Sequence, residues 1–370
     1  MTFFKNIVRP ELNQLSGYSN STIDQTETAL SKRNYIKLDA NLSPYEPFSK
    51  SVSTERLNQY CPQNPITLVS KLAKIYNCDI ENILCTRGSD EAIDLLIRAF
   101  CNPGQDSIIT CPPTFCMYEI FAKIQSANVI EIPLAPELNY QLNTKAILDV
   151  IESESVKIIF IPTPNAPLGN MMRTKDILKI CQACTGKAIV VADEAYLEFS
   201  GQASLFTNFS TEIKNLVSLR TLSKAYSMAG LRIGSMIADP EIVQIISKIQ
   251  APYPISVSSV KVACEALCEE GIAQTNIQIE EAVMLREELS KTLNQQKYVE
   301  KVFPSVTNYV TFISAKSEAL IQYLATNGFL VRSQSEQISN AVRISVGTPE
   351  QTEKLIKLLK KFSPSDSQLY

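Results

Sequence analysis

The 370-residue chain contains no histidine. Because histidine is the side chain that most often transfers protons near neutral pH, any acid–base chemistry must use lysine, tyrosine, cysteine or carboxylates. Long hydrophobic runs are also absent, and the longest, such as 158–161 and 188–192, are far too short to cross a bilayer. The first five residues, Met1 to Lys5, do not begin a secretory signal. We therefore expect a cytoplasmic protein with no membrane partner.

Charge and cysteine content argue against a nucleic-acid-binding protein and against a protein built on disulfides or a metal site. A net charge of -3 and an apolar content of 45% are ordinary for a soluble globular protein and give no sign of nucleic-acid binding. Without a signal peptide, the ten cysteines are expected to be reduced thiols. Cys181 and Cys184 have the spacing of a metal or redox pair, but they fall in a helical apolar pattern, and no histidine can complete a mixed zinc site. We expect packed thiols and no metal.

Short β-branched runs alternate with helical patterns through the first two thirds of the chain. The expected strands cover 82–86, 107–111, 129–132, 156–161, 188–192 and 216–219. This alternation predicts an α/β fold with a mostly parallel sheet flanked by helices. After about residue 254, a helical stretch over 256–293, strands near 311–313 and 342–346 and a helix over 350–362 predict a smaller α+β domain.

The length of the chain also suggests two domains. We expect an N-terminal arm over 1–45 that joins the small domain, a large domain over 46–260 and a small C-terminal domain over 261–370.

The segment 221–234 carries the most informative chemistry. Lys224 lies among the hydroxyl residues Thr221 and Ser223, and Arg232 follows inside a Gly-x-Arg-x-Gly step. A lone lysine on a loop is nearly always solvated. Here the neighbouring residues suit an amine that forms an imine with an aldehyde cofactor while an arginine holds the cofactor's phosphate, so Lys224 is the first candidate.

Three other segments fall at expected strand ends, where ligands of open α/β sheets collect. Segment 87–91 is predicted to bind phosphate through free helix amides or to serve as a plain helix cap. Asp193 ends an apolar strand and is placed to pair with a protonated ring nitrogen or, alternatively, with an arginine. Tyr196 follows three residues later, within reach of a ring hydroxyl. The Pro/Gly loop 162–169 fits a structural turn about as well as a ligand contact.

In their order and spacing these segments resemble the fold-type-I pyridoxal-phosphate aminotransferases and, more narrowly, the histidinol-phosphate aminotransferases. The resemblance extends over nearly the whole chain. It is carried by residues 60–62, 87–91, 97–101, 111–118, 186–196, 220–234, 251–256, 307–309 and 342–348.

The resemblance implies roles for most of these residues. Lys224 would form the imine with pyridoxal 5'-phosphate and transfer a proton, Asp193 would keep the ring nitrogen protonated, and Tyr196 would hydrogen-bond the ring oxygen. The other implied cofactor contacts are Ser89, Asp90, Thr221, Ser223 and Arg232 at the phosphate, Phe115 and Asn165 near the ring, and Tyr60 from the second subunit of a homodimer with active sites at its interface. On the substrate side, Arg343 would bind the carboxylate of the amino donor, with Arg332 and Tyr18 near the substrate phosphate and Asn41 and Asn308 beside them.

One position departs from the family pattern. The family's loop usually reads Asn-Asn-Pro-Thr-Gly, whereas this chain has Ala166 where the second asparagine would contact the ring oxygen. The ring oxygen would then depend on Tyr196 alone, on a water, or on a shifted Asn165. We expect the pKa of the imine to rise, because one stabiliser of its deprotonated form is missing.

The leading interpretation is transamination of L-histidinol phosphate with 2-oxoglutarate, which gives imidazole acetol phosphate and L-glutamate in histidine biosynthesis. An aromatic amino-acid aminotransferase or a threonine-phosphate decarboxylase would share the cofactor motifs and differ mainly in the substrate pocket. A catalytically impaired cofactor-binding homologue is a third alternative, motivated by Ala166 and Leu168. The presence of Lys224, Asp193 and Arg343 argues against it.

Overall fold

The computed structural model describes residues 35–48 and 58–363. Its centre is a seven-stranded sheet in the order β2-β8-β7-β6-β5-β3-β4. The strands are β2 (Ile83–Thr86), β3 (Ser107–Thr110), β4 (Asn128–Glu131), β5 (Val156–Pro162), β6 (Ile189–Asp193), β7 (Leu216–Thr221) and β8 (Gly234–Ile237). From β7 to β4 all neighbours are parallel, whereas β8 is antiparallel to both β2 and β7. The predicted α/β fold is confirmed, but β8 was not predicted.

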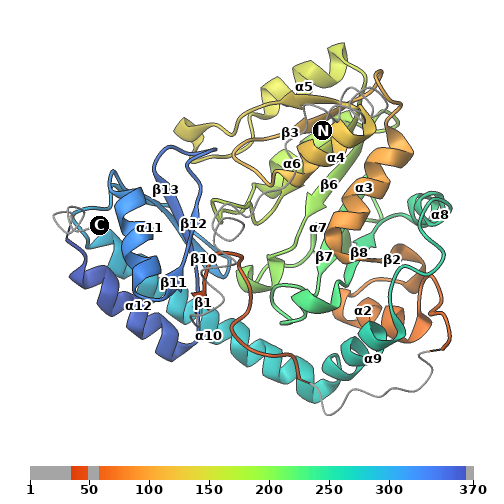
Figure 1. Ribbon diagram of the computed structural model, residues 1–370. Helices are drawn as coiled ribbons and strands as arrows, with labels where there is room; N and C mark the ends of the chain where they lie inside the picture. The colour runs from red at the N-terminus through yellow and green to blue at the C-terminus, as the bar shows by residue number, and fades with distance from the viewer. Residues whose placement is uncertain (1–34, 49–57, 364–370) are drawn as a thin grey trace, which may run out of the picture.

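Both faces of this sheet are covered by helices (Figure 1). Along β5, Ile158 and Phe160 pack on one side and Ile159 and Ile161 on the other, because successive strand residues point to opposite faces. The first face packs against α3 (Gly88–Phe100), α4 (Met117–Gln125) and α8 (Pro240–Ser247). The second packs against α5 (Thr144–Ser153) and α6 (Thr174–Ala183), with α2 (Ile66–Tyr76), α7 (Leu205–Phe209) and α9 (Val257–Ala266) completing this domain. Burial on both faces explains why the central strands are continuously apolar.

The second domain is a four-stranded antiparallel sheet in the order β12-β13-β10-β9. Its strands are β9 (Lys301–Val302), β10 (Tyr309–Ile313), β12 (Arg332–Ser333) and β13 (Ala341–Ser345). They pack against α10 (Glu269–Asn294), which is cyan in Figure 1, and against α11 (Ser317–Thr326) and α12 (Pro349–Lys361), which are blue there. A Thr348 capping box with Gln351 starts α12 where the sequence predicts its closing helix.

The expected helical stretch over 256–293 is two helices, α9 and α10. Cys268 lies between them in an extended conformation, and its sulfur accepts a hydrogen bond from the Gly271 backbone N–H. A Cβ at Gly271 would lie 2.0 Å from the Ala266 carbonyl oxygen, so the close approach of the two helix ends requires glycine there. Apolar periodicity continues through this break and therefore does not reveal it.

Part of the predicted N-terminal arm is attached to the second domain. β1 (Ile36–Lys37) pairs in parallel with β11 (Phe329–Leu330), and the Ser345 N–H donates to the Leu38 carbonyl (Figure 1). Residues 1–34 of the arm, including Tyr18, lie outside the described residues. No helix in the described parts of the chain is long and apolar enough to cross a membrane.

Candidate active site

The carboxyl ends of β5, β6 and β7 open into a cavity of about 350 Å³. Because these strands are parallel neighbours, the residues that end them meet at one edge of the sheet. The cavity is lined by the predicted residues Ser89, Asp90, Phe115, Asp193, Tyr196, Thr221, Ser223, Lys224 and Arg232, together with Ala166 and Tyr118. Positions separated by as much as 143 residues in the sequence (Ser89 to Arg232) therefore form one site.

Asp193 is a buried carboxylate at the end of β6. Its Oδ2 accepts a hydrogen bond of 2.7 Å from the Tyr118 hydroxyl, and its Oδ1 accepts one of 3.2 Å from the Ala195 N–H. Burial raises the pKa of Asp193 to about 6, although the hydrogen bond from Tyr118 opposes this rise. A carboxylate held in this way can pair with a protonated ring nitrogen.

Tyr118 was assigned no role from the sequence, although it lies in the segment 111–118 that carries part of the resemblance. It is fully buried, and its ring stacks on Phe160 with a centroid separation of 4.6 Å. No local pattern pairs it with Asp193, because the two are 75 residues apart.

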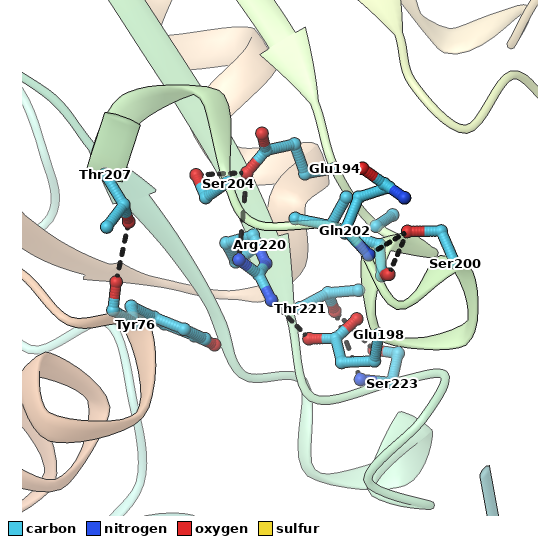
Figure 2. Close-up of polar contacts among 12 residues, drawn as sticks. Tyr76, Glu194, Glu198, Ser200, Gln202, Ser204, Thr207, Arg220, Thr221 and Ser223 are labelled. Atoms are coloured by element: carbon cyan, nitrogen blue, oxygen red, sulfur yellow. Dashed lines mark hydrogen bonds and ion pairs between the residues drawn. The ribbon is translucent and has the colours of Figure 1, made fainter. Parts of the chain in front are cut away.

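A cluster of buried charges includes Glu194, the residue that follows Asp193 in the sequence (Figure 2). The Arg220 guanidinium lies 2.7 Å from the Glu198 carboxylate and 3.7 Å from that of Glu194, and its carbon is 4.7 Å from the centre of the Tyr76 ring. Glu194 also accepts hydrogen bonds from the Ser204 hydroxyl and the Leu205 N–H. The arginine partner weighed as an alternative for Asp193 therefore belongs to Glu194, the next residue. This cluster joins the loop after β6 to the end of β7. Strand β6 ends at Asp193, and Lys224 lies on the loop that follows β7.

Lys224 lies on the loop that follows β7. Its Nζ donates a hydrogen bond of 3.1 Å to the Ala40 carbonyl and lies 5.6 Å from the centre of the Tyr196 ring. The amine is half-buried where this cavity meets a second cavity, which Lys224 also lines. It is therefore accessible to a molecule bound in either of the two cavities.

The other end of the cavity has groups suited to a phosphate. The N-terminus of α3 points its free backbone amides there, and Arg232 reaches Asp90 at 3.1 Å. The Thr221 and Ser223 hydroxyl oxygens lie 3.0 Å apart. A Cβ on Gly234 would lie 2.4 Å from the Gly88 carbonyl carbon, so β8 approaches the start of α3 this closely only with glycine.

A second cavity of about 220 Å³ shares Phe115, Ala166, Tyr196 and Lys224 with the first. The predicted substrate residues Arg332, Arg343 and Asn41 line it. Arg343 donates through Nη2 to the Asp39 carbonyl at 3.0 Å, and its guanidinium lies 5.2 Å from the centre of the Tyr309 ring. Its Nε is buried and has no partner among the described residues. Each guanidinium is suited to an anionic group, either a carboxylate or a phosphate, of a bound substrate.

Four predicted residues do not line these two cavities. Asn165 is fully buried, its amide donates to the Pro113 carbonyl at 3.1 Å, and the cavity wall at this point is Ala166, so the structure gives no support to a cofactor contact by Asn165. Asn308 donates to the Asn41 carbonyl and borders a small separate cavity behind Lys224. Tyr60 is 79% exposed and stacks on Tyr253 outside the cavity of its own subunit. Tyr18 lies outside the described residues.

Cys181 and Cys184 are fully buried in the core between β6 and α6. Burial raises the pKa of Cys181 to about 12 and that of Cys184 to about 11, so both remain thiols at neutral pH. Within residues 35–48 and 58–363, no group of three or more cysteine or carboxylate side chains is placed to hold a metal ion.

Comparison with known proteins agrees with this site. Residues 33–359 match the profile of the family described as aminotransferase class I and II. The chain is 38% identical over 339 residues to histidinol-phosphate aminotransferase 1 from Haemophilus influenzae, which covers 91% of this chain and 95% of that protein. It is 36% identical over 343 residues to the histidinol-phosphate aminotransferase from Escherichia coli, with 92% and 95% covered.

The fold is shared with a solved relative as well. The crystal structure of histidinol-phosphate aminotransferase from Sinorhizobium meliloti in complex with pyridoxal-5'-phosphate has a TM-score of 0.83 at 19% identity, covering 96% of this chain and 98% of that one. The profile match and the sequence relatives each span most of the chain. The chain therefore belongs to the class I and II aminotransferases and, within them, to the histidinol-phosphate aminotransferases.

Proposed function

We propose that this enzyme catalyses the transamination of L-histidinol phosphate with 2-oxoglutarate, which interconverts this pair with imidazole acetol phosphate and L-glutamate in histidine biosynthesis. The observation that carries the proposal is the junction of two cavities at Lys224, one with groups for a phosphorylated pyridine and the other with Arg332 and Arg343. The names of the sequence relatives support this substrate over an aromatic amino acid or threonine phosphate.

The donors in the first cavity fit pyridoxal 5'-phosphate. Asp193 would pair with the ring nitrogen, the Tyr196 hydroxyl would face the ring oxygen, and Phe115 would cover the ring. Ser89, Ser223, Arg232 and the first amides of α3 would hold the phosphate. When bound, the cofactor supplies an electron sink for the electrons released at the substrate Cα.

Lys224 would perform the proton transfer. Its amine borders both cavities, so it can take the proton from the substrate Cα and later return a proton. Arg343 would hold a substrate carboxylate, and Arg332 would hold the phosphate of histidinol phosphate. One pocket then serves both half-reactions, because a guanidinium binds either anion in a bidentate fashion.

The two arginines should affect different substrates. Arg343→Ala is expected to raise the KM for 2-oxoglutarate about 10- to 100-fold, since a hydrogen bond to a charged group contributes about 1.5–3 kcal/mol. Arg332→Ala should act mainly on the KM for histidinol phosphate. Steady-state kinetics with each substrate varied separately would show the split, with exposed Arg173→Ala as the unchanged control. Equal effects of both variants on both substrates would contradict the assignment.

Asp193 predicts a pH dependence for cofactor binding. Because the pKa of this carboxyl is raised to about 6, it becomes protonated as the pH falls below that value and loses its attraction for a protonated ring nitrogen. We expect the affinity of the cofactor-free chain for pyridoxal phosphate to fall up to about tenfold for each pH unit below 6. Equilibrium titrations from pH 5 to 8 would measure this. Asp193→Asn should bind weakly and lack this part of the pH slope, and the same slope in both proteins would contradict the prediction.

The function itself is tested by half-reactions without the second substrate. The holoenzyme is mixed in turn with histidinol phosphate, phenylalanine and threonine phosphate, and the visible absorption band of the bound cofactor is followed. Loss of the band with histidinol phosphate at the lowest concentration supports the proposal. If none of the amines changes the band and borohydride reduction labels no lysine, the proposal fails.

We also propose that the enzyme is a homodimer with active sites at the interface. Tyr60 and its stacking partner Tyr253 are both exposed in the single subunit, although large aromatic side chains are usually buried. This exposure suits a contact with a second copy of the chain, in which Tyr60 would approach the other subunit's phosphate site.

A further inference from the structure

Asn41 makes a contact that its sequence assignment as a substrate residue does not explain. Its Nδ2 donates a hydrogen bond of 2.9 Å to the hydroxyl oxygen of Tyr196, and the side chain is 1% exposed. A phenol oxygen that accepts this bond still has its own proton to donate elsewhere. Because Tyr196 lines the cofactor cavity, that proton is left for a group inside it.

The orientation of the Asn41 amide is fixed by Ser345 at the end of β13. The Ser345 hydroxyl accepts a hydrogen bond of 2.9 Å from the Asn41 backbone N–H and donates one of 3.0 Å to the Asn41 Oδ1. With its oxygen used in this way, the amide must present its nitrogen to Tyr196. The Asn41 backbone has a φ of 53°, a left-handed conformation that asparagine tolerates better than most residues.

The hydrogen bond from Asn41 to Tyr196 gains importance from the alanine at position 166. Ala166 lines both cavities but has no polar side-chain atom, so it leaves Tyr196 without a neighbouring amide donor on that wall. Asn165 lines neither cavity: its side chain is fully buried, and its amide donates to the Pro113 carbonyl. The amide that acts on Tyr196 therefore comes from the N-terminal arm.

We propose that Asn41 is a positioning residue that acts through Tyr196, by occupying the acceptor side of its hydroxyl so that the phenol proton is directed to the ring oxygen of the cofactor. This inference rests on the part of the proposed function that places pyridoxal phosphate in the first cavity. Asn41 bonds Ser345, two residues from Arg343 on β13, so the same contact links the substrate arginine to the cofactor ring. The titratable groups around Tyr196 are Lys224, Tyr309 and, through Tyr118, Asp193.

The test is a pH titration of the visible absorption band of the substrate-free holoenzyme. Deprotonation of the Lys224–cofactor chromophore leaves negative charge on the ring oxygen, which a donated proton from Tyr196 stabilises. Asn41→Ala should therefore raise the midpoint of the titration by about 0.5–1 pH unit, the equivalent of one hydrogen bond. Asn41→Asp should raise it further, because the new carboxylate accepts the Tyr196 proton and turns it away from the cavity.

A double-mutant cycle shows whether the effect passes through Tyr196. In a Tyr196→Phe background, Asn41→Ala should leave the midpoint unchanged, since no phenol remains to be oriented. Ser345→Ala is a milder variant, in which the titration midpoint should rise by a smaller amount. Asn327→Ala, at an exposed asparagine, is the matched control and should leave the midpoint unchanged. An unchanged midpoint in Asn41→Ala, or a shift of equal size in the Tyr196→Phe background, overturns the inference. The titration uses no substrate and therefore tests the role of Asn41 separately from the choice of substrate. If the wild-type enzyme did not act on histidinol phosphate, the proposed function would be contradicted, but the result of the titration would have the same meaning.

Discussion

Lys224→Arg is expected to lower kcat on the order of 10⁴-fold, the upper range for loss of a positioned proton-transfer group. Arginine keeps a cation beside the Ala40 carbonyl, but its guanidinium stays protonated and does not bond covalently to an aldehyde carbon. Loss of activity in this variant therefore reports on the amine and not on the charge. Single-turnover measurements with histidinol phosphate would quantify the loss.

The matched control is Lys175→Arg, an exposed lysine on α6. It should retain wild-type turnover and the same visible band with bound cofactor. Borohydride should attach the cofactor to wild-type protein and to the control but not to Lys224→Arg. A Lys224→Arg enzyme with more than a tenth of wild-type turnover would show that another group carries the proton.

Arg220→Leu should cause the largest loss of stability, about 3–5 kcal/mol in the free energy of unfolding. The reason is that Glu194 and Glu198 would remain buried without their cation, while leucine fills much of the space. Burial already raises the pKa of Glu194 against the effect of Arg220 and its hydrogen bonds, so removal of Arg220 would raise it further. Urea denaturation of the cofactor-free protein, followed by far-UV circular dichroism, would measure the change.

A surface arginine provides the comparison. Arg98 lies 3.6 Å from Asp94 on α3 with half of its side chain exposed, and Arg98→Leu should cost less than about 1 kcal/mol. If Arg220→Leu were as stable as Arg98→Leu, the buried cluster of Figure 2 would contribute no net stability. The triple replacement Arg220→Leu, Glu194→Gln, Glu198→Gln should recover part of the loss, because it removes the unpaired charges as well.

Strand ends could be predicted from the sequence because their signal is local. The apolar runs that became β5, β6 and β7 each end in the polar or turn-forming residues that form the cavity, and parallel pairing brings these ends together. The strand β8 was missed because Gly234 and Ser235 interrupt any apolar alternation. It is held in place mainly by its neighbours β2 and β7, which periodicity does not report.

Side-chain partners within the site were harder to predict. The bonds from Tyr118 to Asp193, from Asn41 to Tyr196 and from Arg220 to Glu198 join residues 75, 155 and 22 positions apart. Each bond forms only when separate helices, strands or loops pack together, so no characteristic residue spacing in the sequence reveals it. The resemblance to the aminotransferases supplied the roles of Lys224 and Asp193, and the cofactor contact that it implies for Asn165 stays a prediction, since the Asn165 amide donates to the Pro113 carbonyl in this structure.

The attachment of the arm to the second domain also sets the order in which the site can be completed during synthesis. Asp39 and Asn41 leave the ribosome early, whereas their partner strand β13 follows about 300 residues later, since each is separated by 304 positions from its partner, Arg343 or Ser345. Contacts of such long range form slowly, because the intervening chain must first be ordered. The large domain can therefore fold with Lys224 in place while the arm is still unpaired, and a ribosome-bound chain that ends before residue 341 should lack the assembled active site.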